Sequence, residues 1–386
     1  MGQGVVSISR CGVYEPSEIA SSLREVLRPL GGMKAFVSPG QRVFLKVNLL
    51  SKAVPDRAVT THPEIVRALI REVRAAGGEP AVGDSPGGRP TAASAARLFE
   101  TTGMTRVCAE EDVRLVLLDD DVVRVPAPTG SVLYSAFDLG REAVEADVLI
   151  SVAKLKTHGF MMFTGAVKNL FGCIPGLEKA RFHLKVPDRD DFGSMLVDLM
   201  LACRPSLAVM DAVVGMEGEG PAGGSPRHIG ALLASADLVA MDVIASSMAG
   251  FDPLEVYTNK AAASRGIGPR TADEVTVVGE DWRALAPDSF ARPARDIASR
   301  MPRGLPARMK QAVTARPHLA RPADCTRCRE CEANCPVRAI EVDRDHGPRF
   351  DLKTCIRCYC CQELCPPQAI GIRVPLLARL MDSGRR

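Results

Sequence analysis

Residues 325–336 read CTRCRECEANCP, and residues 355–366 read CIRCYCCQELCP. Both stretches follow the spacing C-x2-C-x2-C-x3-C-P. A doubled pattern of this kind predicts a small module built from two equivalent halves near the carboxyl end. The rest of the chain can be organised around that module.

The spacing is typical of cysteines that hold iron–sulfur cubes. Three thiolates on one tight loop reach three irons of a cube, while the fourth points away and serves the other cluster. We therefore predict two 4Fe-4S clusters with crossed ligands. The first cluster takes Cys325, Cys328, Cys331 and Cys365, and the second takes Cys355, Cys358, Cys361 and Cys335.

A zinc or disulfide scaffold is the alternative for these cysteines. Structural zinc usually takes two C-x2-C pairs across a longer gap and has no use for the additional cysteines. Cys360 lies beside Cys361, and the register of the motif favours Cys361 as the ligand. We expect Cys360 to be a packed thiol beside the cluster. The stretch 325–372 resembles a bacterial two-cluster 4Fe-4S ferredoxin domain.

Composition limits the classes of protein to consider. The chain has 386 residues, 46% of them hydrophobic, which is enough for one large core and a small appended domain. A net charge of +3 gives no global basic field for a nucleic acid or a membrane surface. The most apolar stretch, 231–250, contains Asp237 and Asp242, which are costly in a bilayer, so we expect no membrane span. No secretory signal pattern opens the chain, and oxygen-sensitive clusters favour a reducing compartment, so we expect a cytoplasmic protein.

The amino-terminal part alternates short apolar runs with segments of helical period. This alternation is the signature of an α/β fold with a mainly parallel sheet and flanking helices. Strands are expected at residues 5–8, 43–47, 80–83, 115–118, 148–152, 206–210, 229–233 and 275–278. Helices are expected at residues 16–27, 63–76, 92–102, 192–201 and 238–248.

The composition changes after the last expected strand. Residues 289–323 hold eight Lys or Arg, one acid and five prolines, which indicates a connector with one short basic helix near residues 307–314. We expect this connector to pack partly across the α/β domain. The predicted organisation is an α/β ligand-binding domain (1–280), a basic proline-rich connector (281–322), a small α+β two-cluster ferredoxin domain (323–373) and a tail (374–386).

Ligands of open parallel sheets lie beyond the carboxyl ends of the strands, so polar residues there are the candidates. Four expected strand ends carry such residues: KVN at 46–48, GDSPGG at 83–88, KLKTH at 154–158, and Asp211 followed by GMEGEGP at 215–221. Together with THP at 61–63 and FTGAVKNLFG at 163–172, these motifs resemble the domain of unknown function 362 family over roughly residues 5–279. The resemblance implies the α/β fold and an association with iron–sulfur domains, and it implies no reaction.

Lysines and glycine-rich backbone at these strand ends predict an anion site. Ammonium groups and exposed N–H groups both favour negative oxygens, so we expect a ligand with a carboxylate or phosphate. The loop 83–88 is neither G-x-G-x-x-G nor a Walker A motif. The ligand-binding candidates are Lys46, Asn48, Asp84, Ser85, Gly87, Gly88, Lys168, Asn169, Asp211, Glu217 and Glu219. The alternatives are solvated surface lysines and, for Asp84 and Ser85, a turn cap.

Three residues are candidates for catalysis: His158, Lys156 and Lys154. A histidine after two lysines at a strand end suits a proton donor, although a lone histidine is more often structural. The acids Asp211, Glu217 and Glu219 suit a hard divalent cation or acid–base work, and a plain surface loop is the alternative.

The leading functional hypothesis is an iron–sulfur oxidoreductase. Its two clusters would relay electrons between a redox partner protein and an anionic small molecule at the strand ends. Two alternatives stay open: an electron-carrier or docking module without its own turnover, and a cofactor-maturation factor. Convergence of the lysines and His158 on one crevice would favour the enzyme.

Overall fold

A nine-stranded sheet forms the centre of the molecule in this computed structural model, which describes residues 4–88, 90–293, 313–376, 378 and 380. The strand order is β11-β1-β10-β9-β7-β2-β3-β4, and β8 (Met162–Phe163) pairs with β7 off this path. Along the path only β10 runs antiparallel to its neighbours, so the predicted α/β fold with a largely parallel sheet is confirmed. The strands are β1 (Val5–Arg10), β2 (Arg42–Lys46), β3 (Glu79–Asp84), β4 (Arg114–Leu117), β7 (Val148–His158), β9 (Leu207–Glu217), β10 (Ser225–Ser235) and β11 (Thr276–Gly279).

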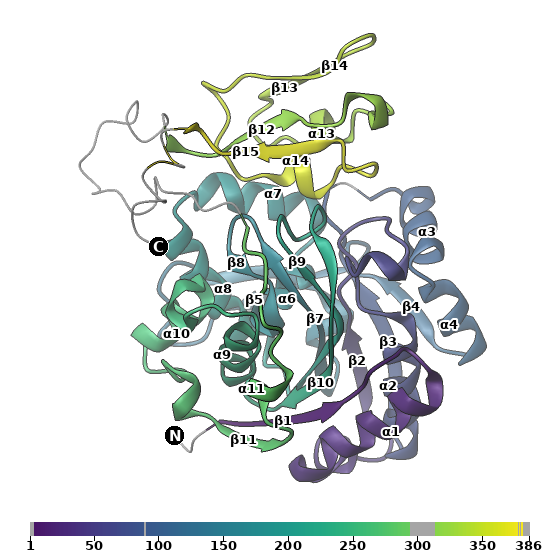
Figure 1. Cartoon of the computed structure of the whole chain (residues 1–386). Helices are drawn as coiled ribbons and strands as arrows, with labels where there is room; N and C mark the ends of the chain where they lie inside the picture. The colour runs from purple at the N-terminus through teal and green to yellow at the C-terminus, as the bar shows by residue number, and fades with distance from the viewer. Residues whose placement is uncertain (1–3, 89, 294–312, 377, 379, 381–386) are drawn as a thin grey trace.

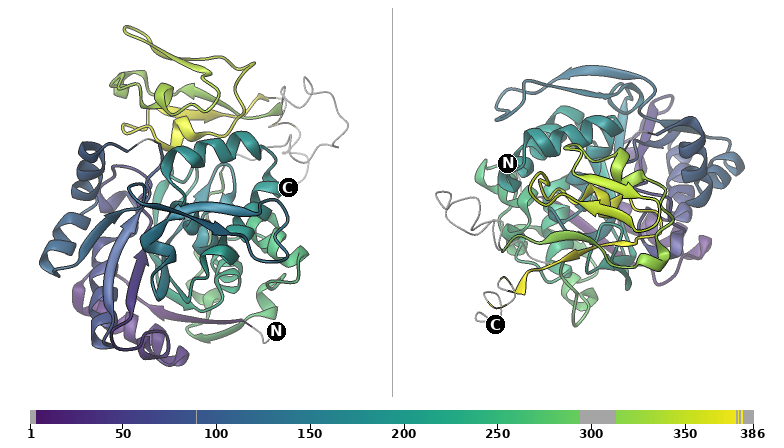
Figure 2. Two further views of the ribbon diagram at one scale, coloured as in Figure 1. Left: turned by 180° about the vertical axis from the view of Figure 1, so that it is seen from behind. Right: turned by 90° about the horizontal axis from the view of Figure 1, so that it is seen from above.

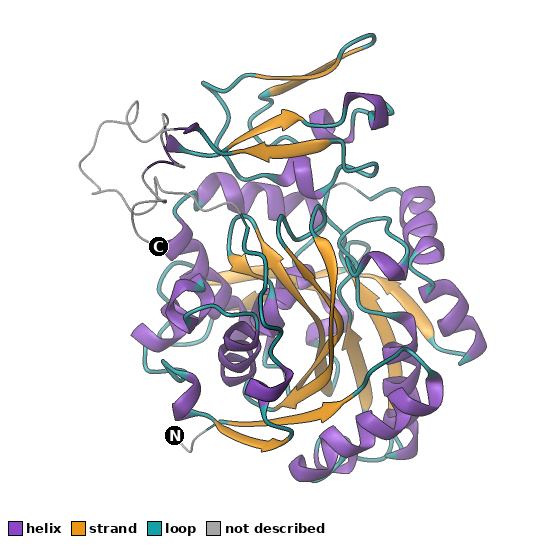
Figure 3. Ribbon diagram, viewed as in Figure 1, coloured by secondary structure: helices purple, strands orange, loops and turns teal. Residues whose placement is uncertain are grey.

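Helices cover both faces of the sheet (Figures 1 and 3). One face carries α1 (Pro16–Leu27), α2 (Pro63–Ala75), α3 (Ala92–Thr101) and α4 (Met104–Glu110). The other carries α6 (Gly165–Asn169), α7 (Gly176–Lys185), α8 (Arg189–Cys203), α9 (Leu238–Met248) and α10 (Tyr257–Ser264).

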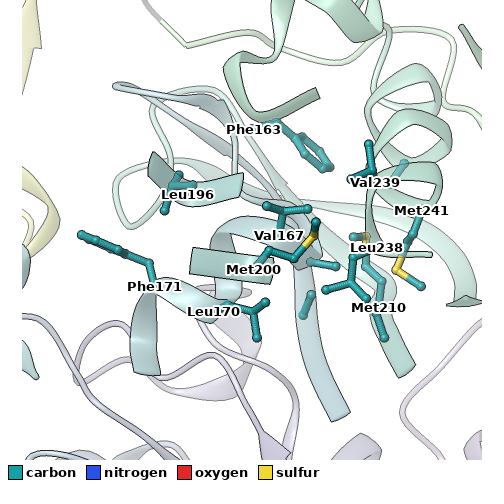
Figure 4. Packing of buried hydrophobic residues seen from close by; sticks show 14 of the residues in the cluster. Phe163, Val167, Leu170, Phe171, Leu196, Met200, Met210, Leu238, Val239 and Met241 are labelled. Carbon is teal, nitrogen blue, oxygen red and sulfur yellow. The ribbon is translucent and has the colours of Figure 1, made fainter. Parts of the chain in front are cut away.

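Alternation along the strands supplies a hydrophobic core to each face. In β7, Ile150 and Val152 enter the core under α1 and α2, whereas Leu149 and Ala153 enter the core under α8 and α9. Figure 4 shows part of the second core, where Met200 lies close to Val167.

All eight expected strands and all five expected helices are present in the α/β domain. Strand β7 continues six residues beyond its expected end because its buried polar carboxyl half, which includes Lys154 and His158, pairs with β9 and β8. The hairpin of β5 (Val122–Pro126) and β6 (Ala136–Gly140) was not expected, nor were α4, α7 and α10.

The carboxyl-terminal residues form a small module that lies over the carboxyl ends of the parallel strands (Figures 1 and 2). Two antiparallel pairs and two short helices build it: β12 (Arg316–Leu319) with β15 (Ile370–Arg373), β13 (Ile340–Asp343) with β14 (Gly347–Phe350), α13 (Glu330–Ala333) and α14 (Cys360–Glu363). Its two halves have the same backbone conformation at three equivalent positions, where both residues have positive φ. The pairs are Arg327 with Arg357, Arg329 with Tyr359, and Arg338 with Gln368.

Part of the predicted connector is described. Gly218 N–H donates to Ala291 O at 2.7 Å, and Arg292 pairs with Glu255 at 2.6 Å, so the first part of the connector packs on the α/β domain as expected. The predicted helix near residues 307–314 lies mostly outside the described residues. The exact domain boundaries stay predictions.

Candidate functional site

A cavity of about 90 Å³ lies between the α/β domain and the carboxyl-terminal module. The cavity lies beyond the carboxyl ends of β2 and β3. Beside it, β2 and β7 are neighbouring strands, and the chain continues from β2 toward one edge of the sheet and from β7 toward the other edge. Open α/β sheets bind ligands at such a point. Eight residues predicted to bind a ligand line this cavity: Lys46, Asn48, Asp84, Ser85, Gly87, Gly88, Lys168 and Asn169.

A buried ion pair lies at the sheet side of the cavity. Lys46 Nζ is 2.6 Å from Asp84 Oδ1, and Leu49 N–H donates to Asp84 Oδ2 at 2.6 Å. Gly172 makes room for the pair, because a Cβ at this position would lie 2.1 Å from Asp84 Oδ1. The charges of Lys46 and Asp84 therefore offset each other inside the protein.

Lys179 was not predicted as a site residue. Its ammonium donates at 2.6 Å to both the carbonyl oxygen and the hydroxyl of Ser85, and at 3.1 Å to Pro86 O. Burial lowers the pKa of Lys179 to about 8, although Asp84 and Asp119 raise it. Helix α7 brings Lys179 and His183 to the cavity, and the only sequence signal was their position just after the motif at 163–172.

The opposite wall carries polar groups that lack internal partners. Lys168 Nζ lies 5.6 Å from the centroid of the Phe171 ring and makes no hydrogen bond or ion pair with any residue that the structure describes. Burial lowers the pKa of Lys168, while Glu363 raises it. Within the same described part of the chain, Thr164 Oγ1 and His183 Nδ1 are buried without a hydrogen-bond partner.

His183 is held by aromatic packing. Its ring stacks on Phe192 with centroids 4.6 Å apart and meets Phe160 and Phe171 edge to face. Burial lowers the pKa of His183 to about 3, so its imidazole is neutral near pH 7.

The carboxyl-terminal module closes the cavity with Asn334, Cys360, Glu363 and Leu364. The contact is tight at the glycine-rich loop, because a Cβ on Gly87 would lie 2.5 Å from Leu364 Cδ2. At Gly88, where φ is +87°, a Cβ would lie 2.5 Å from Asn334 Oδ1. These glycines therefore permit close docking of the module as well as lining the cavity.

A second glycine-rich loop, residues 218–224, also docks the module. Gln362 Nε2 donates to Glu219 O at 3.1 Å, and Gln368 donates to Ala222 O. Arg57 donates to Gln368 Oε1 at 2.6 Å. Just before this loop, the Glu217 carboxylate at the end of β9 accepts from Ala291 N–H at 2.9 Å, which joins β9 to the first part of the connector.

Lys154 and Asp211 lie outside the cavity in a buried network. Lys154 Nζ donates to Asp211 Oδ2 and to Tyr14 Oη, each at 2.8 Å, and the Tyr14 ring stacks on His62 at 3.6 Å. Burial lowers the pKa of Lys154, and the nearby Asp211 raises it. Lys154 falls on the opposite face of the sheet from Lys46, because side chains alternate along the strands.

The other two catalytic candidates, Lys156 and His158, do not line the cavity, but each lies against a residue that does. Lys156 Nζ donates to Asn48 Oδ1 at 2.8 Å and to Val59 O at 2.6 Å, and burial lowers the pKa of Lys156 to about 7. His158 Nδ1 accepts from Phe160 N–H at 3.1 Å, and its Nε2 lies 3.5 Å from Glu363 Oε1. Burial lowers the pKa of His158 well below its usual value.

The cysteines of the module gather in crossed sets. One pocket is lined by Cys325, Cys328, Cys331 and Cys365, so the fourth cysteine of the second motif lies with the first three of the first motif. Burial raises the pKa of Cys335, and the nearby Cys358 and Cys355 raise it further, which places Cys335 with the second loop.

Two further properties concern metals and membranes. No three His, Cys, Asp or Glu side chains among the described residues are arranged to hold a metal ion. The predicted cation site at Asp211, Glu217 and Glu219 therefore gains no support.

No helix in residues 4–88, 90–293 or 313–376 is long and apolar enough to cross a membrane.

Comparisons with known proteins found the following similarities. A thylakoid-associated protein of Synechocystis sp. is 38% identical over 289 residues, covering 75% of this chain and 87% of that protein. The lactate racemase apoprotein from Thermoanaerobacterium thermosaccharolyticum superposes with a TM-score of 0.38 at 14% identity, over 61% of this chain and 55% of the racemase. The model of the family described as domain of unknown function (DUF362) matches residues 43–247, which include the strand ends around the cavity. The chain therefore belongs to the DUF362 family.

Proposed function

We propose that this protein is an iron–sulfur oxidoreductase that transfers electrons to or from an anionic small molecule in the interdomain cavity. One observation carries the proposal. The cavity is lined by strand-end residues such as Lys46 and, from the module, by Cys360 and Glu363, which flank the cysteine Cys361. A molecule in this cavity would touch both the α/β domain and the second cysteine loop.

The cysteines suit two 4Fe-4S clusters in their donor set and grouping. Four thiols line one pocket, and Cys335 joins the other loop. Ala339 N–H donates to Cys335 Sγ and Ala369 N–H donates to Cys365 Sγ, each at 3.2 Å, and such bonds favour a thiolate. Three cysteines of one motif with the fourth of the other motif form the pattern of two-cluster 4Fe-4S modules, and structural zinc usually takes two C-x2-C pairs. Bound clusters would supply one-electron transfer.

The side chains around the cavity provide binding and limit the access of water. Lys168 offers an ammonium to an anionic ligand, while Leu364 on Gly87 limits the access of water. Lys179 donates to Ser85 and Pro86, so its ammonium holds the glycine-rich loop in place at the cavity. In this proposal Lys156 holds Asn48 in place, and His158 faces Glu363. Lys156 and His158 therefore act on the ligand through these neighbours.

Anaerobic chemistry tests the proposal. Protein purified without oxygen should be reduced by dithionite, and a substrate should then reoxidise it with a rate that saturates with concentration. Lys168→Met should lose this saturation while keeping the iron content of the wild type. Reduced protein that no small anion reoxidises faster than buffer does would contradict the proposal.

A second candidate is an electron carrier or maturation factor without its own turnover. One observation favours it: Lys154, predicted to be catalytic, is bonded to Asp211 and Tyr14 outside the cavity. In that case a redox partner protein, rather than a small molecule, would reoxidise the reduced clusters. A cytoplasmic location remains part of either proposal.

A further inference from the structure

Unpartnered polar atoms gather at the interdomain cavity. Thr164 and His183 line it, and Thr164 Oγ1 and His183 Nδ1 are buried without a hydrogen-bond partner among the described residues. Lys168 Nζ lies over the Phe171 ring and makes no hydrogen bond or ion pair with any residue that the structure describes. Buried polar atoms nearly always have partners, so this concentration points to a polar ligand group on the wall formed by α6 and α7.

The charges around the cavity limit the charge of that ligand. Three ammonium groups line it, from Lys46, Lys168 and Lys179, against the carboxylates of Asp84 and Glu363. Glu363 lies near Lys168 and, behind the cavity wall, near Lys156, while Asp119 lies near Lys179; the charges of Lys156 and Asp119 offset each other in this count. One positive charge is left in excess.

Among the lining residues that the structure describes, Lys168 is the lysine whose ammonium makes no hydrogen bond or ion pair. Lys46 pairs with Asp84 at 2.6 Å, and Lys179 uses its three N–H groups on Ser85 and Pro86. A ligand anion therefore meets a single available ammonium, which suits one negative charge better than two.

Size and apolar lining limit the rest of the ligand. A cavity of about 90 Å³ has room for several water-sized atoms, which suits a small ligand. Leu50, Phe171 and Leu364 give the cavity apolar walls next to its polar end.

We propose that the cavity binds a small monocarboxylic acid, with its carboxylate at Lys168 and Thr164 and its apolar body between Phe171 and Leu364. His183 then faces the ligand with a neutral ring nitrogen. This inference rests on the proposed function in taking the interdomain cavity as the substrate site. It adds the class, charge and size of the substrate.

Calorimetric titration of the oxidised full-length protein, without any electron donor, tests the ligand class. The probes are hexanoate, the neutral analogue hexanamide and the dicarboxylate adipate. Hexanoate should bind about ten- to a hundredfold more tightly than hexanamide, because the charge-assisted hydrogen bond to Lys168 is lost in the amide. Adipate should bind more weakly than hexanoate. Equal binding of acid and amide, or tighter binding of adipate, would overturn the proposal, and this comparison needs no variant.

Variants locate the carboxylate. Lys168→Met should weaken hexanoate binding about ten- to a hundredfold and remove the preference for acid over amide, while Lys168→Arg should retain part of it. Lys185→Met, on an exposed residue at the end of α7, is the matched control and should bind like the wild type. Unchanged hexanoate binding by folded Lys168→Met would refute the assignment. If hexanoate binds through Lys168 but no 2-oxo or unsaturated acid of this size reoxidises reduced protein, the proposed function fails while the ligand class stands.

Discussion

Replacing Lys154 by methionine should destabilise the α/β domain rather than act on the ligand alone. Lys154 and Asp211 have side chains at most 1% exposed and are joined at 2.8 Å. Methionine keeps the apolar stem but leaves the Asp211 carboxylate buried without its cation. Removing one partner of a buried pair typically costs about 3–5 kcal/mol. Asp211 keeps hydrogen bonds from Tyr14 Oη and from the N–H groups of His62 and Val213, so we expect a loss near the lower end, about 3 kcal/mol.

Anaerobic urea unfolding measures this loss. The double variant Lys154→Met with Asp211→Asn removes both charges and should be more stable than Lys154→Met alone, because no buried charge is left without a counter-charge. Arg42→Met, which breaks an exposed pair with Asp147, is the control and should unfold with the wild type. If Lys154→Met unfolds like the wild type yet loses ligand binding, Lys154 acts on the ligand and the structural assignment is wrong.

Three further predictions concern the clusters, the core and domain docking. Anaerobic protein should contain about eight irons and eight sulfides per chain, Cys360→Ser should keep them and Cys361→Ser should lose iron, whereas stoichiometric zinc would contradict the assignment. Burial raises the pKa of Asp242 from 3.8 to about 7, so the native state holds a proton that the unfolded chain releases near pH 4. Stability from this group is therefore lost as pH rises from about 4 to 7, and Asp242→Asn should flatten the pH dependence of urea unfolding in that window. Gly87→Val should press on Leu364 and speed proteolysis between the domains, while an unchanged cleavage rate would show that the contact is not tight.

The sequence predicts the sheet well because its strands are short apolar runs between helical segments. The strand-end rule also identifies Lys46, Asn48 and Asp84, since each lies at or just beyond the carboxyl end of a parallel strand at the same edge of the sheet. Lys154 shows where the rule is insufficient. It was expected at a strand end, but β7 continues to His158, alternation turns Lys154 to the other face, and its partner Asp211 is distant in sequence.

The remaining site residues depend on contacts that leave no local pattern. Lys179 and His183 reach the cavity only because α7 packs across the strand ends, and a helix with buried polar residues has no distinctive period. Glu363 and Leu364 enter from the module, and only the structure reveals that Leu364 meets Gly87. A glycine pair in the sequence suggests phosphate binding as readily as it suggests docking.

Stopped-flow reoxidation of dithionite-reduced protein by small 2-oxo and unsaturated monocarboxylic acids tests the central claim most directly. Wild type, Lys168→Met and the control Lys185→Met would be compared at equal iron content. The account predicts that at least one acid reoxidises wild type and Lys185→Met with a rate that saturates, and that Lys168→Met loses the saturation. Rates that rise linearly with every acid and are the same in all three proteins would contradict a substrate site in the interdomain cavity.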